Sequence, residues 1–94
     1  MKGGLSAFMK SAALDLAGKK IRCNAVLPGM VETPLVIDER ILTEEQLDAD
    51  RKLYPLKRFG KTEEIAHAII FLLSDASSWM TGTEVVIDGG RSLK

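Results

Sequence analysis

The sequence of 94 residues is poor in the residues that several classes of protein depend on. Its single cysteine, Cys23, excludes an internal disulfide framework and a metal site built from several cysteines, and it favours a reducing compartment. It has only three prolines and a hydrophobic share of 46%, a composition that favours folding over disorder. No apolar run approaches the roughly 18 residues that span a bilayer, and the opening MKGGLSAFMK lacks the hydrophobic segment and cleavage site of a signal peptide.

An excess of charge of one sign is also absent. Lys plus Arg and Asp plus Glu both number 13, so the formal net charge is zero. This balance argues against a nucleic-acid partner and against a membrane surface, both of which attract basic proteins. The length leaves room for one compact domain at most. We therefore expect a soluble, cytoplasmic chain without separate cofactor and substrate domains.

Three helices are predicted by periodicity and capping signals. Apolar residues from Leu5 to Ala17 recur at the spacing of one helix face, and Gly18 is positioned to cap the end of this helix. Thr43 and Gln46 have the spacing of a capping box, which predicts a short helix over about 44–53. The third helix should begin near Thr62, end near Ser74 and bury most of its apolar residues.

Two strands are predicted between and after these helices. Residues Ile21–Leu27 indicate a buried strand that ends at Pro28-Gly29, and Glu84–Asp88 forms a β-branched run closed by Gly89-Gly90. Strands that alternate with helices favour an α/β fold with a parallel sheet. Because an isolated pair of strands is only marginally stable, we expect these two to need neighbours outside this sequence.

Nine short segments of the sequence form a pattern through their order and spacing. They are Lys2-Gly3-Gly4-Leu5, Leu14-Asp15-Leu16-Ala17, Ile21 to Gly29, Thr33-Pro34, Arg58-Phe59-Gly60-Lys61, Glu63-Glu64-Ile65-Ala66, Phe71-Leu72-Leu73-Ser74, Thr81-Gly82 and Asp88-Gly89-Gly90. Together they resemble the C-terminal portion of the short-chain dehydrogenase/reductase family, and within it the type of 3-oxoacyl-[acyl-carrier-protein] reductases and glucose 1-dehydrogenases. The resemblance implies that residues 1–94 are the C-terminal part of one doubly wound, Rossmann-type parallel sheet, with about two of its strands and three of its helices.

The resemblance also implies a function, namely hydride transfer between NAD or NADP and a carbonyl or alcohol substrate. Lys2 matches the catalytic lysine of the family's Tyr-x-x-x-Lys pair, which lowers the pKa of the tyrosine and holds the cofactor ribose. The residues that match the nicotinamide end of the cofactor site are Pro28, Gly29, Val31 and Thr33. There, the Thr hydroxyl and a backbone amide reach the carboxamide, and glycine permits close backbone approach. A plain turn that ends a strand would explain the same segment without a ligand.

Other parts of the family's machinery would precede residue 1. These are the catalytic tyrosine, serine and asparagine. The family's glycine-rich phosphate loop is missing as well, because no G-x-G-x-x-G pattern occurs among the eight glycines. We therefore expect a truncated reading of a longer gene, with its N-terminal half missing, that is inactive and does not bind NADH or NADPH by itself. The alternative is a non-catalytic association module that uses the first helix and the C-terminal strand, as in the family's dimers and tetramers.

Tyr54 is close in sequence to two cations, but it is not expected to be catalytic. Pro55 biases Tyr54 away from helical geometry, so the phenol would not stack over Lys57 or Arg58. The apolar patch 35–37 and the following residues up to 61 resemble the family's substrate-binding region. A lid and an ordinary solvated helix both explain this stretch.

The remaining single residues receive structural interpretations. His67 should be a solvent-facing or hydrogen-bonded residue of its helix, and we predict no metal site. Cys23 should act as a small hydrophobic residue in a buried strand. Trp79 and Met80 should pack in the core or at a subunit interface.

Overall fold

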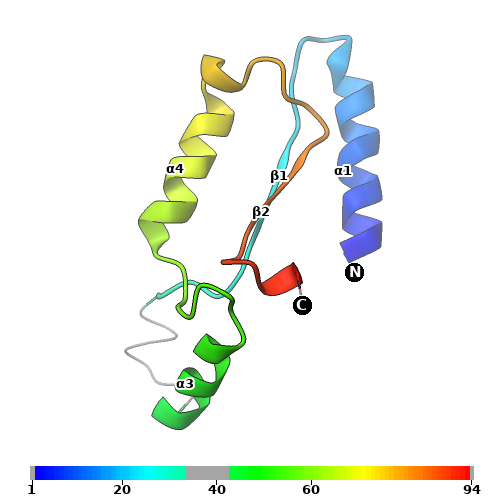
Figure 1. Cartoon of the computed structure of the whole chain (residues 1–94). Helices are drawn as coiled ribbons and strands as arrows, with labels where there is room; N and C mark the ends of the chain where they lie inside the picture. The colour runs from blue at the N-terminus through cyan, green and yellow to red at the C-terminus, as the bar shows by residue number, and fades with distance from the viewer. Residues whose placement is uncertain (1, 34–42, 94) are drawn as a thin grey trace. The chain divides into compact units, whose positions relative to one another are not determined.

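The computed structural model describes residues 2–33 and 43–93 (Figure 1). The chain divides into two compact units, Met1–Leu27 with Ala68–Val86 and Pro28–His67 with Ile87–Lys94. The elements, in chain order, are the helix α1 (Lys2–Ala17), the strand β1 (Ala25–Pro28), the helices α3 (Glu44–Lys52) and α4 (Thr62–Leu73), the 3-10 turn η1 (Asp75–Ser77), the strand β2 (Glu84–Ile87) and the 3-10 turn η2 (Arg91–Leu93). This order confirms the predicted α/β alternation.

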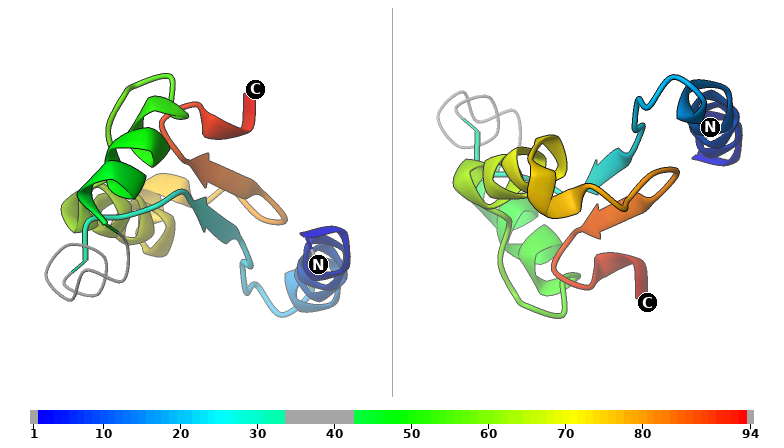
Figure 2. Two further views of the ribbon diagram at one scale, coloured as in Figure 1. Left: turned by 90° about the horizontal axis from the view of Figure 1, so that it is seen from below. Right: turned by 90° about the horizontal axis from the view of Figure 1, so that it is seen from above.

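The first unit contains most of a two-stranded parallel sheet. Strands β1 and β2 are neighbours in this sheet, and they lie side by side in every view (Figures 1 and 2). The backbone N–H of Ala25 donates to the carbonyl of Thr83 at 2.9 Å at the start of the ladder. The ladder is shorter than predicted, because the residues before Ala25 bond to an irregular segment instead. Thus the N–H of Cys23 donates to the Thr81 hydroxyl at 3.1 Å, and Cys23 lies half-buried outside the strand.

Helix α1 ends in a left-handed turn at a residue that the sequence did not indicate. Lys20 has a φ of 60°, and the N–H of Ile21 donates back to the carbonyl of Leu16 at 3.2 Å. The N–H of Lys20 also donates to the carbonyl of Ala17, which completes a Schellman motif. The predicted cap at Gly18 is therefore wrong, because the left-handed position falls two residues later.

The apolar faces of the helices are less buried than predicted. Over residues 3–17 of α1 only Met9 and Ala13 are buried, whereas Phe8 and Leu14 are exposed. No described residue of α4 is buried, so the predicted burial of its apolar side chains is wrong. Trp79 is 99% exposed, which excludes a place in the core of this chain. A sheet of two strands offers too little surface to cover these side chains.

The second unit has a small aromatic core. Leu47 of α3 packs with Tyr54 and Phe59. The rings of Tyr54 and Phe59 meet edge to face, with their centroids 5.8 Å apart. The predicted capping box at the start of α3 is confirmed, since the N–H of Gln46 donates to the Thr43 hydroxyl and the Gln46 side chain accepts from the Thr43 N–H. This box and the buried Leu47 together fix where α3 begins and which face it buries.

His67 is exposed on α4, as predicted. Among residues 2–33 and 43–93, no helix has both the length and the apolar character needed to cross a membrane. Within the same residues, no group of three or more His, Cys, Asp or Glu side chains is arranged to hold a metal ion.

Candidate functional site

The loop that leaves β1, residues 29–33, is held at the carboxyl end of the sheet. The N–H of Gly29 donates to the carbonyl of Ile87 at 3.0 Å and so continues the parallel pairing past the end of β1. The next N–H, of Met30, donates to the Tyr54 hydroxyl at 2.9 Å. In open α/β sheets, ligands bind beyond the carboxyl ends of the strands. The position of this loop therefore makes it a candidate binding segment.

A second contact fixes the middle of the loop through an isolated parallel bridge between Val31 and Gly60. The N–H of Gly60 donates to the carbonyl of Met30 at 3.0 Å, and the N–H of Glu32 donates to the carbonyl of Gly60 at 2.9 Å. In this parallel bridge Gly60 bonds to the residues on either side of Val31, so the N–H and the carbonyl of Val31 itself point away from Gly60. The N–H of Val31 thus points away from Gly60, on the side of the loop that these hydrogen bonds do not use.

Gly29 is required for packing within the chain. A Cβ atom at this position would lie 3.0 Å from Cβ of Asp88 and 3.0 Å from Cε1 of Tyr54. These distances are shorter than a normal carbon contact. Glycine at this position therefore allows Tyr54 and Asp88 to approach the loop backbone, a reason that differs from the close ligand approach expected from the sequence.

The turn that follows β2 closes around Asp88. Its carboxylate accepts hydrogen bonds from the N–H groups of Gly90 and Ser92, each at 3.0 Å. Hydrogen bonding from Ser92, and then from backbone N–H groups including that of Gly90, holds the pKa of Asp88 below its usual value. Gly90 has a φ of 86°, and a Cβ there would lie 2.9 Å from Cγ of Pro55. Only glycine satisfies both the backbone angle and this contact.

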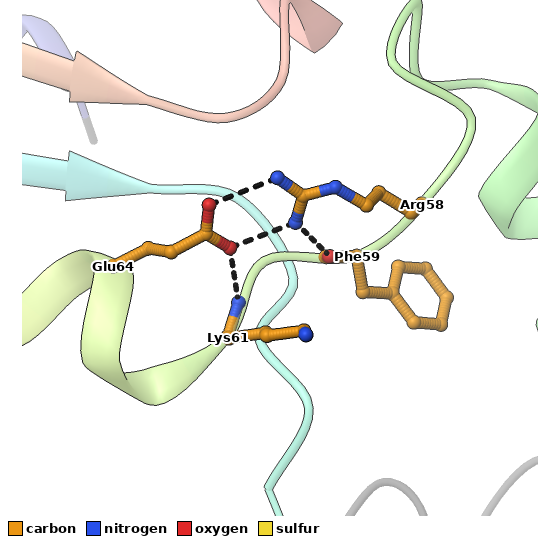
Figure 3. Close-up of polar contacts among 4 residues, drawn as sticks. All are labelled: Arg58, Phe59, Lys61 and Glu64. Atoms are coloured by element: carbon orange, nitrogen blue, oxygen red, sulfur yellow. Dashed lines mark hydrogen bonds and ion pairs between the residues drawn. The ribbon is translucent and has the colours of Figure 1, made fainter.

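A bidentate ion pair joins the segment before α4 to its first turn. The Arg58 guanidinium donates to the two Glu64 carboxylate oxygens at 2.7 and 2.9 Å, and the Lys61 N–H donates to the same carboxylate at 2.9 Å (Figure 3). The hydrogen bond from Arg58, followed by that from Lys61, lowers the pKa of Glu64 to about 2. This pair brackets Gly60, the residue that bridges to the loop.

A pocket of about 110 Å³ lies within this second unit. Ligand sites for small molecules usually measure about 300–1,000 Å³, so this pocket could hold only part of a ligand. Its lining combines the loop backbone with the ion pair and the turn after β2, and includes Gly29, Met30, Tyr54, Arg58, Glu64 and Asp88.

Four of the five predicted site residues are close in sequence and lie at the end of β1 and in the loop that follows it. Pro28 ends β1 and is exposed, and Gly29, Val31 and Thr33 are half-buried in the loop. Lys2 begins α1 in the first unit. The patch 35–37 of the predicted substrate-binding region lies outside the described residues. Sequence reasoning missed the bond from the Met30 N–H to the Tyr54 hydroxyl, because the two residues are 24 positions apart in the chain.

A parallel strand pair, crossing helices and a fixed loop at the carboxyl end of the strands define an α/β protein of the Rossmann type. The chain belongs to the short-chain dehydrogenase/reductase family, and its residues 1–92 match the family model described as enoyl-(acyl carrier protein) reductase. This finding confirms the resemblance stated from the sequence.

Individual relatives agree with this assignment. The chain is 46% identical over 89 residues to a 3-oxoacyl-[acyl-carrier-protein] reductase of Thermotoga maritima, a match that covers 95% of the chain. It is 39% identical over 92 residues, 98% of its length, to glucose 1-dehydrogenase 2 of Bacillus subtilis. A crystal structure of a short chain dehydrogenase family protein from Francisella tularensis superposes with a TM-score of 0.84 at 39% identity, covering 99% of the chain.

The chain matches only part of each of these proteins. It covers 35% of the Thermotoga reductase, 35% of the Bacillus dehydrogenase and 42% of the Francisella structure. The activity, substrates and partners of a whole family member are therefore proposals for this chain.

Proposed function

We propose that residues 28–33 form the nicotinamide wall of an NAD- or NADP-dependent oxidoreductase acting on a carbonyl or alcohol substrate. One observation carries the proposal: hydrogen bonds to Ile87, Tyr54 and Gly60 fix the loop and leave the Val31 N–H directed away from the bridge. A carboxamide offers one acceptor and two donors, which suits the Val31 N–H and the hydroxyl of Thr33, two residues later in the loop. The residues present thus fit this end of the cofactor.

When bound, the nicotinamide would supply or accept the hydride, and this chain would orient its ring. By family resemblance, Lys2 would hold the ribose and lower the pKa of a tyrosine outside these residues.

We further propose that residues 1–94 are the C-terminal portion of one Rossmann domain, with the phosphate-binding loop in the other portion. The partial coverage of the relatives supports this division. The single, half-buried Cys23 favours a reducing cytoplasm as the location.

The test is a chimera in which this chain replaces the matching segment of the Thermotoga reductase. We expect the chimera to bind NADH or NADPH saturably, and Thr33→Val to weaken that binding by about two- to tenfold through loss of one hydrogen bond. The matched control is Thr81→Val, which removes a hydroxyl that accepts from Cys23 in the first unit. A chimera that binds neither cofactor, or a Thr33→Val variant that binds as tightly as its parent, would refute the proposal.

A second candidate function is association without catalysis, which the exposed apolar surface of α1 favours. Leu5 is 65%, Phe8 73% and Leu14 79% exposed in the isolated chain. Leu5 and Phe8 are three residues apart and share one face of α1, and adjoining exposed apolar side chains mark interaction surfaces. Light scattering on the purified chain decides between a homo-oligomer, which we expect for this function, and a monodisperse monomer, which would exclude it.

A further inference from the structure

We propose that Tyr54 is a positioning residue that, together with Gly60, sets the direction of the Val31 amide and ties it to helix α3. The inference rests on the proposed function of the loop. Tyr54 itself has no assigned role there, and its side chain is 8% exposed within the core of the second unit. Its ring and its hydroxyl reach the loop by two separate contacts.

The first contact is the hydrogen bond from the Met30 N–H to the Tyr54 hydroxyl, 2.9 Å long. The carbonyl group of Met30 is also fixed, because it accepts a hydrogen bond from the Gly60 N–H at 3.0 Å. With both its N–H and its carbonyl bonded, Met30 has little freedom to rotate. The Tyr54 hydroxyl thus holds the peptide that joins Gly29 to Met30, and Gly60 holds the next peptide, which carries the Val31 N–H. The two bonds together set the direction of the Val31 N–H.

The second contact is the packing of the ring beside the loop backbone. Cε1 of Tyr54 lies 3.0 Å from the place of a Cβ on Gly29, so the ring fills the space that a side chain would need. Cδ1 of the same ring lies 3.6 Å from the place of a Cβ on Gly89, in the turn after β2. One edge of the ring thus lies against both glycines, and this packing holds the hydroxyl beside Met30.

Tyr54 also continues the turn that ends α3. Its N–H donates to the carbonyl of Arg51 at 3.1 Å, and its ring packs in one cluster with Leu47 of α3. Arg51 in turn lies over the Phe59 ring at 5.1 Å from the centroid. A displacement of α3 would move Tyr54 with it, and Tyr54 would move the Met30 peptide. The position of α3 and the direction of the Val31 amide are therefore coupled.

The variant that isolates the hydroxyl is Tyr54→Phe, which keeps the ring. In the chain itself, we expect amide hydrogen exchange at Met30 to become about fivefold faster through loss of one hydrogen bond, with exchange in α1 unchanged. In the Thermotoga chimera, the same variant should weaken NADH binding by about two- to tenfold and leave the affinity for ADP-ribose, which lacks the nicotinamide, unchanged.

Thr81→Val is the matched control, because it also removes a hydroxyl that accepts from a backbone N–H, that of Cys23. It should speed exchange at Cys23 and change neither Met30 exchange nor NADH affinity. Unchanged Met30 exchange in Tyr54→Phe would overturn the positioning role, as would equal losses of NADH and ADP-ribose affinity. Failure of the parent chimera to bind NADH would instead overturn the proposed function, and with it the cofactor half of the inference.

Discussion

The Arg58 guanidinium and the Glu64 carboxylate face each other in parallel and share two hydrogen bonds, of 2.7 and 2.9 Å. Between them in sequence lies Gly60, whose N–H and carbonyl both bond to the candidate cofactor loop. The pair therefore braces the backbone that fixes the loop, and it also caps the first turn of α4 through the Lys61 N–H. A charged pair on the surface thus stabilises the backbone that holds the loop.

Glu64→Gln should lower stability at neutral pH and remove part of the acid sensitivity. The pKa of Glu64 is lowered from 4.5 to about 2 in the folded chain, so its ionised form favours folding. This contribution is present above the ordinary pKa and is lost as pH falls from about 4.5 to about 2. The free energy of unfolding measured across this window should fall less steeply in Glu64→Gln than in the parent chain.

Glu63→Gln is the control for this prediction, because the neighbouring carboxylate accepts from the Thr62 hydroxyl and not from Arg58. An identical pH dependence in Glu64→Gln and the parent would contradict the role of the pair.

Gly29→Ala should destabilise the second unit by about 1–3 kcal/mol, the usual cost of forcing extra carbon into a packed site. The new methyl group would meet Asp88 and Tyr54 at 3.0 Å. Gly4→Ala is the matched control, since nothing lies within 4 Å of its added Cβ and alanine is the better helix former. Chemical denaturation of both variants measures the difference, and equal stabilities would show that the loop has room for a side chain.

Lys20→Gly should stabilise the chain by about 0.5–1 kcal/mol, because glycine adopts a positive φ without steric cost. Gly18→Ala should also stabilise, since Gly18 is not among the residues with positive φ and nothing lies near its added Cβ. Thermal unfolding of the two variants tests where α1 is capped. A loss of stability in Gly18→Ala would show that Gly18 caps α1, as the sequence indicated.

Phe8→Gln should reduce self-association, because Phe8 is the most exposed aromatic residue of α1, at 73%. Lys10→Gln changes a neighbouring exposed residue of the same helix to the same amide, and it should leave association unchanged. Sedimentation or light scattering as a function of concentration compares the two. Equal association of both variants would place any interface away from this part of α1.

The sequence by itself determined the family, the order of the elements and most of their bounds. Capping residues such as Thr43 and the spacing of apolar side chains act within one or two turns of chain, so they can be recognised without a structure. The candidate site residues Pro28, Gly29, Val31 and Thr33 came instead from the resemblance to the family, and their role at the cofactor stays a prediction. Predicted burial was wrong in α4, because burial depends on surface that other parts of a sheet must supply.

Only the tertiary structure decided how the loop is held. Tyr54 bonds to Met30 from 24 residues away. Gly60, which also follows α3 in the chain, bonds to the same residue. No local pattern encodes such a contact, because the chain between the partners can take many paths and only packing selects one.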